Sequence, residues 1–483
     1  MRFLLAVIIC KILYFIGRQI GKGSSLPGRI ALKLCPDVLK QLKLPETIIA
    51  VTGSNGKTST VELIVHALES TGISTGWNRE GSNQTEGIAT ALLRIADLKG
   101  NVRRGALVLE CDERYARLIF KHIHPTVLVV TNLCRDQLTR NGHHEFIQDH
   151  IREAITVAGE STLLILNADD PFVAALAVPA SASSGAMLRK ENIIWFGIDP
   201  DAAIGFFRVA LPDPGQIASH VSRLQLLEQY SARDTSGDIY NDGAFCPLCK
   251  ELMLYKNRIA GHFGDYRCIS CGFRRPAPAS EITALDFSNE TVTVNTGEKA
   301  AIRPLCLTGI YNFIAAVAAA GTAGCSESEI IHSLDDYELT GGRTVRLKIG
   351  DRNGALLISK HENSLSYNQS LTQTVKHDGP CTVVFMVDAI SRKYYTSETS
   401  WLWDVDFDIL LNLDDCRVIL TGRYSDELMA RFAMTAIDSD MIDCVPDRHK
   451  LHDHILKNTS GDIYAITCFS DRKKLLKALK CRK

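Results

Sequence analysis

Apolar runs alternate with helix-like patterns between residue 46 and about residue 197. The runs typical of buried strands are TIIAVTG, GALVLECDE, TVLVVTNL, STLLILNADD and ENIIWFG. Between them, apolar residues recur at helical spacing after Lys57 and in HEFIQDHIREAI. Near-continuous apolar runs are typical of strands covered on both faces, and the helices between them supply the crossovers that parallel strands need. The pattern therefore predicts an α/β fold built on a parallel sheet.

A second alternation follows the segment TGGRT. Its strand-like runs are VRLKI, GALLISK, CTVVFMVD, FDILLNL, RVILTG and DIYAITCF, again separated by helical patterns. We therefore predict a larger domain over residues 46–339, a hinge at 340–343 and a smaller α/β domain over residues 340–483.

The first part of the chain, residues 1–45, predicts a separate helical segment. Its start, MRFLLAVIICKILYFIGRQIGKG, resembles a targeting signal, but Lys11 interrupts the apolar run after eight residues and no small-residue cleavage site follows. We expect an amphipathic helix that packs on the protein, with contact at a membrane surface as the alternative.

Charge and cysteine content bear on three properties: the kind of partner, the state of the thiols and the cellular location. The 483 residues include 54 basic and 55 acidic side chains, so the formal net charge of −1 gives no electrostatic reason to expect nucleic acid as the main partner. The 15 cysteines are an odd number, and in a large chain with nucleotide-site signals they indicate reduced or metal-bound thiols. We expect a cytoplasmic location, with the inner face of the membrane as an alternative.

The stretch VTGSNGKTST predicts a phosphate-binding loop between a strand and a helix. Gly53 and Gly56 permit a tight turn that brings backbone N–H groups against an anion, and the helix start adds its dipole. Lys57 would neutralise the terminal phosphates, and the Thr58 hydroxyl would bind the Mg²⁺ that bridges them. Val51 stands where the general P-loop pattern has a glycine, so only a shorter form of the pattern fits. The structural alternative is a glycine turn capped by Ser and Thr.

Polar motifs follow the predicted strands of the larger domain. Because ligands bind at the carboxyl ends of parallel strands, we expect four of these polar motifs to lie together in one nucleotide site. A carboxylate of LECDE would hold Mg²⁺, or else form a solvated acidic turn. Asn132 would orient substrate or nucleotide, or else cap a helix. Asn312 would hydrogen-bond an adenine edge, or else lie in a turn at a helix start. The four motifs are Gly53 to Thr58, Glu110 to Glu113, Asn132 to Gln137 and Asn167 to Asp170.

Four cysteines have the spacing of a zinc ribbon. Cys246 and Cys249 form one CxxC pair, and Cys268 and Cys271 form a second pair, with 18 residues between the two pairs. Two such turns bring four thiolates to one tetrahedral ion, which leaves no open position for substrate. The spacing therefore predicts a structural zinc site, and the other cysteines are expected to be small core residues.

Several of these motifs together resemble a known family. TGSNGKTST, NREGSNQTEGIATALL, LECDE, TNLCRDQLTRNG and LNADDP resemble the central ATPase domain of the Mur ligases, whose phosphate loop has the short TGTNGKT form. The insert with GHFGDYRCISCGFRRP, the segment LPGRIALKL and the stretch SWLWDVDF narrow the resemblance to the MurT family over nearly the whole chain. This implies a Mur ligase-type P-loop ATPase domain with a zinc-ribbon insert at about residues 243–277, followed by a smaller C-terminal α/β domain.

MurT proteins are the synthetase subunits of lipid II isoglutaminyl synthase and work with a GatD-like glutamine amidotransferase. The resemblance implies that ATP phosphorylates the α-carboxyl of D-glutamate in the lipid II stem peptide. Ammonia made by the partner from glutamine would then displace phosphate and leave D-isoglutamine. The resemblance thus implies a heterodimer, lipid II at the membrane surface as acceptor, ATP as second substrate, and Mg²⁺ and structural Zn²⁺ as cofactors.

The resemblance also assigns roles to residues of this chain. Thr58 and Glu110 would hold Mg²⁺, and Arg343 would reach the γ-phosphate from the second domain when the hinge closes. Lys57, Glu110 and Arg343 are therefore the predicted catalytic residues. The predicted ATP-binding residues are Gly53, Asn55, Gly56, Lys57, Thr58, Ser59 and Asn312.

Two loops depart from the family pattern. The chain has SKHENSLSYNQ where the family has a KNPAGFN-like segment, so His361, Glu362 and Asn363 replace Asn-Pro-Ala. It has RKYYTSETSWLWD where the family has a DGRDVSWLWD type of loop. MurT proteins are thought to lend an aspartate from this loop to the Cys–His pair of the partner, and here either Glu398 or Asp404 would serve.

These departures keep two other functions open. One is a Mur ligase-like paralogue that forms an amide or peptide bond on a different carboxylate. The other is a zinc-ribbon binding protein in which the nucleotide site is a switch, since the ribbon has basic and aromatic residues that could hold nucleic acid. The second is the weaker alternative, because Glu110 and Arg343 would have no role in a passive binding module.

Overall fold

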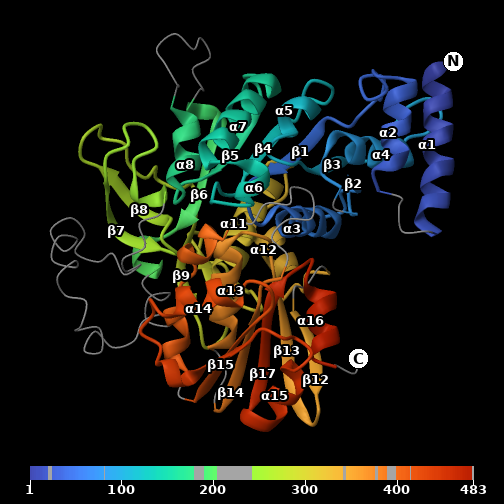
Figure 1. The fold of residues 1–483 in the computed structure, drawn as a ribbon. Helices are drawn as coiled ribbons and strands as arrows, with labels where there is room; N and C mark the ends of the chain where they lie inside the picture. The colour runs from blue at the N-terminus through green and yellow to red at the C-terminus, as the bar shows by residue number, and fades with distance from the viewer. Residues whose placement is uncertain are drawn as a thin grey trace.

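In the part of the chain that the structure describes, the strands form two sheets and one inserted hairpin (Figure 1). We call them the nine-stranded unit, the C-terminal unit and the ribbon hairpin. The structure is a computed structural model and describes residues 1–19, 24–80, 82–178, 190–203, 242–340, 344–375, 379–388, 399–413 and 415–480.

The nine-stranded sheet is parallel over most of its width. Its strands are β1 (Thr47–Thr52), β2 (Thr75–Trp77), β3 (Ala106–Glu110), β4 (Val127–Val130), β5 (Leu163–Asn167), β6 (Ile193–Ile198), β9 (Ser280–Asp286), β10 (Thr291–Val294) and β11 (Lys299–Ala301). They lie in the order β11-β10-β9-β6-β5-β4-β1-β3-β2, and of these neighbours only β9 with β10 and β10 with β11 run antiparallel. The phosphate loop follows β1, so it lies near the middle of the parallel part.

Helices cover both faces of this sheet. They are α1 (Arg2–Gln19), α2 (Leu26–Leu34), α3 (Lys57–Ser70), α4 (Thr85–Ile95), α5 (Ala116–Ile119), α6 (Leu138–Asn141), α7 (His144–Ala158), α8 (Pro171–Ala174), α11 (Leu307–Gly321) and α12 (Glu327–Leu334). Ile49 and Val51 of β1 lie in a core with α3, α11 and α12. Ile48 and Ala50 lie in a second core with α4, α5 and α7. This double coverage explains why the run reads as continuously apolar, and it confirms the predicted parallel α/β sheet.

The C-terminal unit is a six-stranded sheet of the same kind. Its strands are β12 (Thr344–Ile349), β13 (Arg352–Ser359), β14 (Cys381–Met386), β15 (Cys416–Thr421), β16 (Ile442–Val445) and β17 (Asp462–Cys468), and its helices are α13 (Ser364–Thr374), α14 (Ser425–Phe432), α15 (Leu451–Asn458) and α16 (Arg472–Ala478). The order is β12-β13-β17-β14-β15-β16, with only the β12–β13 pair antiparallel. α13 and α14 pack on one face, and α15 and α16 pack on the other.

One predicted strand of this unit is wrong. The run FDILLNL forms a 3₁₀ helix, Phe407–Asn412, whose Phe407 ring packs against Phe385 and Phe432. The strand that the prediction missed is β16, which pairs with β15 at the edge of the sheet. Periodicity does not separate a short apolar run that packs as a helical turn from one that forms a strand, and this explains the error.

The ribbon hairpin lies between β6 and β9 in the sequence. Its strands β7 (Met253–Ile259) and β8 (Phe263–Cys268) pair antiparallel, and Figure 1 shows them to the left of β6. The Tyr266 hydroxyl donates to the carbonyl of Ala168 at 3.0 Å, and the Gly264 amide donates to the carbonyl of Asp169 at 2.9 Å. The hairpin is therefore fastened to the segment that follows β5.

The N-terminal helices belong to the core on the α4 face. α1 packs against α2 and α4, and its Ala6, Val7 and Cys10 are fully buried there. This agrees with the expected amphipathic helix packed on the protein. Among the described residues, no helix combines the length and the apolar character needed to span a bilayer.

An ion pair under the ribbon hairpin leads to a stability prediction. The Arg275 Nε lies 2.7 Å from Asp169 Oδ1, and both side chains are largely buried. We expect Arg275→Ala to lower the free energy of unfolding by about 3–5 kcal/mol, because it leaves the Asp169 carboxylate buried without its cation. Denaturant titration followed by far-ultraviolet circular dichroism measures the change. The matched control is Arg274→Ala, whose exposed side chain should matter by no more than about 0.5 kcal/mol. Equal midpoints for both variants would contradict the prediction.

Candidate nucleotide site and zinc ribbon

The phosphate loop joins β1 to α3 in a conformation that needs glycine at two positions. Gly53 has φ +129° and Gly56 has φ +83°, which side-chain-bearing residues rarely adopt. A Cβ atom on Gly56 would lie 2.0 Å from Asn312 Oδ1, and one on Gly53 would lie 2.3 Å from Thr131 Oγ1. The two glycines therefore allow the loop to fold tightly against β4 and α11.

The segment after β4 holds the loop in place. Asn132 Oδ1 accepts from the Asn55 amide at 2.9 Å, and its Nδ2 donates to the Asn55 carbonyl at 3.1 Å. The Thr131 hydroxyl donates to the same carbonyl at 2.7 Å, and the Ser54 hydroxyl donates to the Cys134 carbonyl at 3.0 Å. Asn132 thus orients the phosphate loop, and it does not cap a helix.

Lys57 is buried among carboxylates at the start of α3. Its Nζ lies 2.6 Å from Glu113 Oε1 and 2.5 Å from the carbonyl of Gly53. Burial by itself lowers the pKa of the Lys57 ammonium, but Glu113 and Glu110 outweigh this effect and raise its pKa above the ordinary value. The ammonium is therefore a fixed positive charge at the loop, where incoming phosphates would compete with Glu113 for it.

Thr58 and Glu110 form the pair expected of a magnesium site. The Thr58 hydroxyl donates to Glu110 Oε2 at 2.8 Å, and Asn83 Nδ2 donates to the other carboxylate oxygen at 2.9 Å. Two neighbouring ligands of an octahedral Mg²⁺ lie about 3 Å apart, given metal–oxygen distances of about 2.1 Å. The Asn78 side chain holds the Glu110 backbone through two hydrogen bonds of 2.9 Å. The residues present therefore fit Mg²⁺ bound by one hydroxyl and one carboxylate.

Asn312 and Ser59 complete the residues predicted to bind nucleotide. Asn312 lies on α11, inside the helix, and its Oδ1 accepts from the Thr60 hydroxyl at 3.3 Å. Its side-chain amide therefore occupies the space into which a Cβ atom on Gly56 would project. Ser59 follows Thr58 in the first turn of α3 and is partly exposed.

The C-terminal unit adds residues to this site that the sequence analysis missed. Lys360, at the end of β13, donates through Nζ to the Ser54 carbonyl at 2.6 Å and to Asp136 Oδ2 at 2.5 Å. Asn363 donates to the other oxygen of Asp136 at 3.1 Å. The only available signal was a lysine at the carboxyl end of a predicted strand, which gives no indication of a partner in the other unit. A second cation thus reaches the phosphate loop from the C-terminal unit.

This contact leads to a prediction about coupling between the two units. We expect Lys360→Met and Asp136→Asn each to lower ADP release by about tenfold, and the double variant to be no worse than either single one. Side chains in direct contact have coupling free energies of about 0.5–3 kcal/mol in such a cycle. Steady-state ADP release with ammonium and acceptor measures all four proteins. The control is Lys348→Met, an exposed lysine on β12. Strictly additive losses would show that the two side chains act independently.

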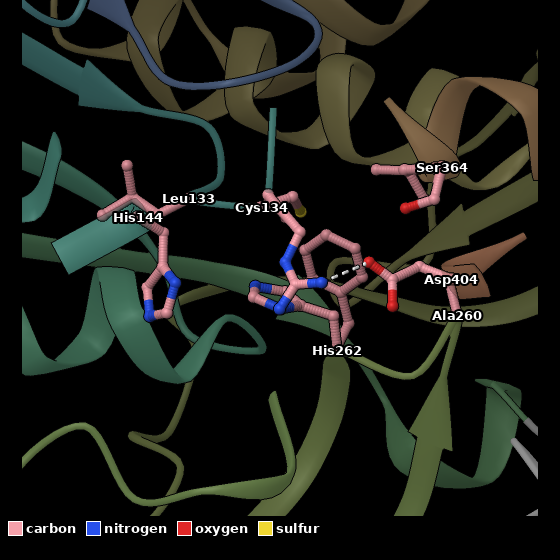
Figure 2. A pocket seen from close by; sticks show the side chains of 10 residues that line it. Leu133, Cys134, His144, Ala260, His262, Ser364 and Asp404 are labelled. Carbon is pink, nitrogen blue, oxygen red and sulfur yellow. Dashed lines mark hydrogen bonds and ion pairs between the residues drawn. The ribbon is translucent and has the colours of Figure 1, made fainter. Parts of the chain in front are cut away.

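A pocket lies where the nine-stranded unit, the ribbon hairpin and the C-terminal unit meet, and Figure 2 shows its lining residues. Arg135 NH1 lies 3.0 Å from Asp404 Oδ2, and this ion pair joins the two large units. On the ribbon side, His262 Nε2 lies 3.1 Å from the buried Asp170 Oδ2. Burial opposes charge on His262, but Cys134 and Asp170 raise its pKa well above the ordinary value. The pocket is therefore bounded by ion pairs that link three parts of the fold.

The motif Asn167 to Asp170 is not gathered into the nucleotide site as predicted. Asp169 accepts from Arg275, from the Tyr311 hydroxyl at 2.8 Å and from the Ile198 amide at 2.8 Å. Asp170 accepts the amides of residues 133, 172 and 173 and pairs with His262. These carboxylates hold the ribbon hairpin and the strand ends, whereas the other three motifs meet at the phosphate loop.

The four predicted zinc ligands converge at the ribbon hairpin. Their sulfur atoms all lie within 4.8 Å of one another, with 3.6 Å between Cys246 and Cys271 and 3.4 Å between Cys249 and Cys268. Thiolates bound to zinc at about 2.3 Å have sulfur–sulfur separations of about 3.8 Å in a tetrahedron. The cluster therefore fits a closed four-thiolate zinc site.

Comparison with known proteins agrees with this arrangement. The Mur ligase middle domain matches residues 51–196, and the MurT ligase C-terminal domain matches residues 361–471. The MurT subunit of the glutamine-hydrolysing lipid II isoglutaminyl synthase of Staphylococcus aureus N315 is 27% identical over 92% of this chain and 90% of the relative. The MurT subunit of Streptococcus pneumoniae R6 is 28% identical over 89% of this chain and 86% of the relative. The chain therefore resembles MurT subunits over nearly its whole length.

Solved structures place the fold of this chain among those of the Mur ligases. A pseudomurein peptide ligase of type C from Methanothermus fervidus superposes with a TM-score of 0.63 at 18% identity, covering 92% of this chain and 80% of that one. MurF from Acinetobacter baumannii superposes with a TM-score of 0.56 at 15% identity, covering 93% and 80%. The predicted Mur ligase-type fold is confirmed. The expectation of an ATP-dependent ligase agrees with the relatives named above.

Two predicted MurT residues, Arg343 and Glu398, lie outside the described residues. The altered loop at residues 359–369 lies at the junction of the two units. Glu362 is buried with φ +45°, and the Asn363 side chain accepts from the Ser366 amide at the start of α13. Asn363 therefore both caps α13 and contacts Asp136 of the nine-stranded unit.

Proposed function

We propose that the chain is the synthetase subunit that amidates the α-carboxyl of D-glutamate in the lipid II stem peptide. The observation that carries the proposal is its similarity to two lipid II isoglutaminyl synthase MurT subunits over 92% and 89% of its length. The arrangement of Lys57, Thr58 and Glu110, which fits a nucleotide with its magnesium ion, supports it.

The proposed reaction has two steps. A carboxylate oxygen of the acceptor attacks the γ-phosphorus of ATP, so an acyl phosphate forms and ADP leaves. Ammonia then attacks the acyl carbon, the carbon–oxygen bond to phosphate breaks, and loss of a proton leaves the carboxamide and inorganic phosphate. Activation is needed because a carboxylate is a poor electrophile until one of its oxygens becomes part of a phosphate.

The residues at the loop have distinct parts in this proposal. The Lys57 ammonium would leave its ion pair with Glu113 and bind the phosphates. There it would stabilise the charge that moves between the phosphoryl groups. Mg²⁺ held by Thr58 and Glu110 would neutralise the phosphate oxygens. Lys360 would bring a second positive charge from the C-terminal unit, and zinc at the four cysteines would be structural.

A glutamine amidotransferase partner of the GatD type would supply the ammonia. Asp404 forms an ion pair with Arg135 of its own chain, and its side chain is only 10% exposed. An acid that serves a partner's Cys–His pair has to reach across the interface, so we assign this part to Glu398.

This assignment gives a sharp kinetic prediction. We expect Glu398→Gln to lower glutamine-dependent amidation by about 10²-fold or more while ammonium-dependent amidation stays unchanged. Asp404→Asn should affect both reactions, because it breaks the contact between the two units. Amidation measured with glutamine and with ammonium, in the complex with the partner, tests both variants. A selective loss in Asp404→Asn alone would reverse the assignment.

The function itself is tested with the purified chain, Mg-ATP, ammonium and a lipid II acceptor that carries D-glutamate. Free ammonium replaces the partner, so the experiment isolates this subunit. Mass spectrometry follows the conversion of carboxylate to carboxamide, and a coupled assay follows ADP. Equal amounts of amide and ADP are the expected result.

A second acceptor distinguishes the alternative. ADP release that requires another carboxylate, with lipid II left unmodified, would establish a Mur ligase-like paralogue. The altered segment at Lys360–Asn363 is the feature that favours this alternative, because it lies between the phosphate loop and the C-terminal unit.

A further inference from the structure

Exposed apolar side chains are concentrated on α1. Among the described residues, eighteen large hydrophobic side chains are exposed, and seven of them lie within the first sixteen residues. They are Met1, Leu4, Leu5, Ile8, Ile12, Phe15 and Ile16, with exposed fractions between 36% for Ile8 and 107% for Met1. The spacing of three to four residues places them along one face of the helix. A contiguous apolar face of this kind marks an interaction surface.

The opposite face of α1 fixes the helix to the protein. Ala6, Val7 and Cys10 are small and fully buried, so the helix approaches α2 and α4 closely. The Tyr14 hydroxyl donates to Glu80 at 2.5 Å and accepts from Arg94 at 2.9 Å. Packing and hydrogen bonds therefore hold α1 in one orientation with its apolar face outward. Figure 1 shows the helix at the edge of the molecule.

The charges of α1 leave this outward face uninterrupted. Lys11, the only charged residue between Arg2 and Arg18, turns inward and donates to the Arg94 carbonyl at 2.7 Å. Arg2 and Arg18 are exposed and lie near the two ends of the helix. An apolar face between two basic ends is the pattern of a helix that lies in a membrane interface.

The surrounding segment is strongly basic, in contrast with the rest of the chain. Residues 1–45 carry eight Lys or Arg and a single acidic residue, Asp37. The remainder has 46 basic and 54 acidic residues, the differences from the totals of 54 and 55. A second copy of this segment would repel it, whereas anionic phospholipid headgroups would attract it.

We propose that the exposed face of α1 docks this chain onto an anionic phospholipid bilayer, with Leu5, Ile8, Ile12, Phe15 and Ile16 in the interface. Exposed basic side chains of residues 1–45, Arg2 and Arg18 among them, contact the headgroups, and the helix lies along the surface. This surface is separate from the nucleotide site, and the proposal does not depend on the proposed function.

Flotation of the full chain with lipid vesicles tests the proposal. The vesicles contain phosphatidylcholine alone, or phosphatidylcholine with about one third phosphatidylglycerol, and they contain neither lipid II nor nucleotide. We expect an apparent affinity for the anionic vesicles that is at least about tenfold higher, and that falls as salt rises. Binding without lipid II separates this result from any failure of the amidation assay.

Variants and a matched control identify the surface. Ile12→Ser with Phe15→Ser should lower binding about tenfold or more, and Arg2→Glu with Arg18→Glu should remove the preference for anionic lipid. Phe469→Ser is the control, because Phe469 is 69% exposed and Phe15 is 70% exposed. Unchanged thermal unfolding shows that the variants fold. Absence of vesicle binding would overturn the proposal. So would equal binding by the Ile12/Phe15 variant and wild type, or a dimer in solution that this variant splits.

Discussion

Lys57→Ala is expected to lower ATP-dependent amidation by about 10²–10³-fold, the loss typical of removing one group that stabilises transition-state charge. The Lys57 ammonium is fixed between Glu113 and the Gly53 carbonyl, and Glu113 and Glu110 keep its pKa above the ordinary value. Because the charge is held in place before nucleotide binds, little reorganisation is needed during phosphoryl transfer. ADP release and amide formation, measured together with ammonium as nitrogen source, give the effect.

The control for this experiment is Lys121→Ala, which removes an exposed lysine after α5. It should keep wild-type rates, and both variants should keep the wild-type unfolding temperature. If Lys57→Ala retained ADP release within a factor of about two, the phosphate loop would not be the site of ATP chemistry.

Cys268→Ser is expected to remove most of the zinc and to open the ribbon hairpin. Structural zinc sites in peptides bind with apparent free energies of about 10–16 kcal/mol, so the loss of one of four thiolates should destabilise the whole hairpin. Cys268 and Cys246 are fully buried in a small cluster with Met253, Tyr255 and Tyr266, which would become exposed. Metal analysis should give one zinc per wild-type chain and close to none in the variant.

Limited proteolysis reports the opening directly, because cleavage should begin within the hairpin in Cys268→Ser. Cys444→Ser is the matched control, since Cys444 is an exposed cysteine on β16, away from the cluster. A variant that keeps full zinc content and resists protease like the wild type would contradict the zinc assignment.

Local sequence patterns account for much of this fold. Runs such as TIIAVTG predict buried parallel strands because both faces are covered, and VTGSNGKTST predicts the turn because only glycine adopts its backbone conformation easily. The two CxxC pairs predict the cysteine cluster because each CxxC turn brings two sulfur atoms to the same metal ion. The parallel α/β sheet follows from these patterns, and the Mur ligase-type fold follows from the family resemblance; both are confirmed. The roles of the individual site residues stay predictions.

Other features of the site depend on contacts that no local pattern records. Lys360 reaches the Ser54 carbonyl across 306 positions of the chain, and Asn83 meets Glu110 from a loop that has no regular pattern. Asp169 lies in a motif that looks like part of a nucleotide site, yet its oxygens bind the ribbon hairpin and Tyr311. These partners are set by how the units pack together, and packing is a property of the whole chain.

The Lys360 contact also ties the affinity for nucleotide to the relative position of the two units. Ser54 belongs to the loop that would surround the phosphates, so any rearrangement of that loop on binding acts on the lysine. If docking of the two units raises the affinity for nucleotide by some factor, thermodynamic reciprocity requires that bound nucleotide raise the equilibrium constant for docking by the same factor. An acceptor that binds between the units would therefore change the apparent affinity for ATP without contacting the nucleotide. ATP would change the affinity for the acceptor by the same factor.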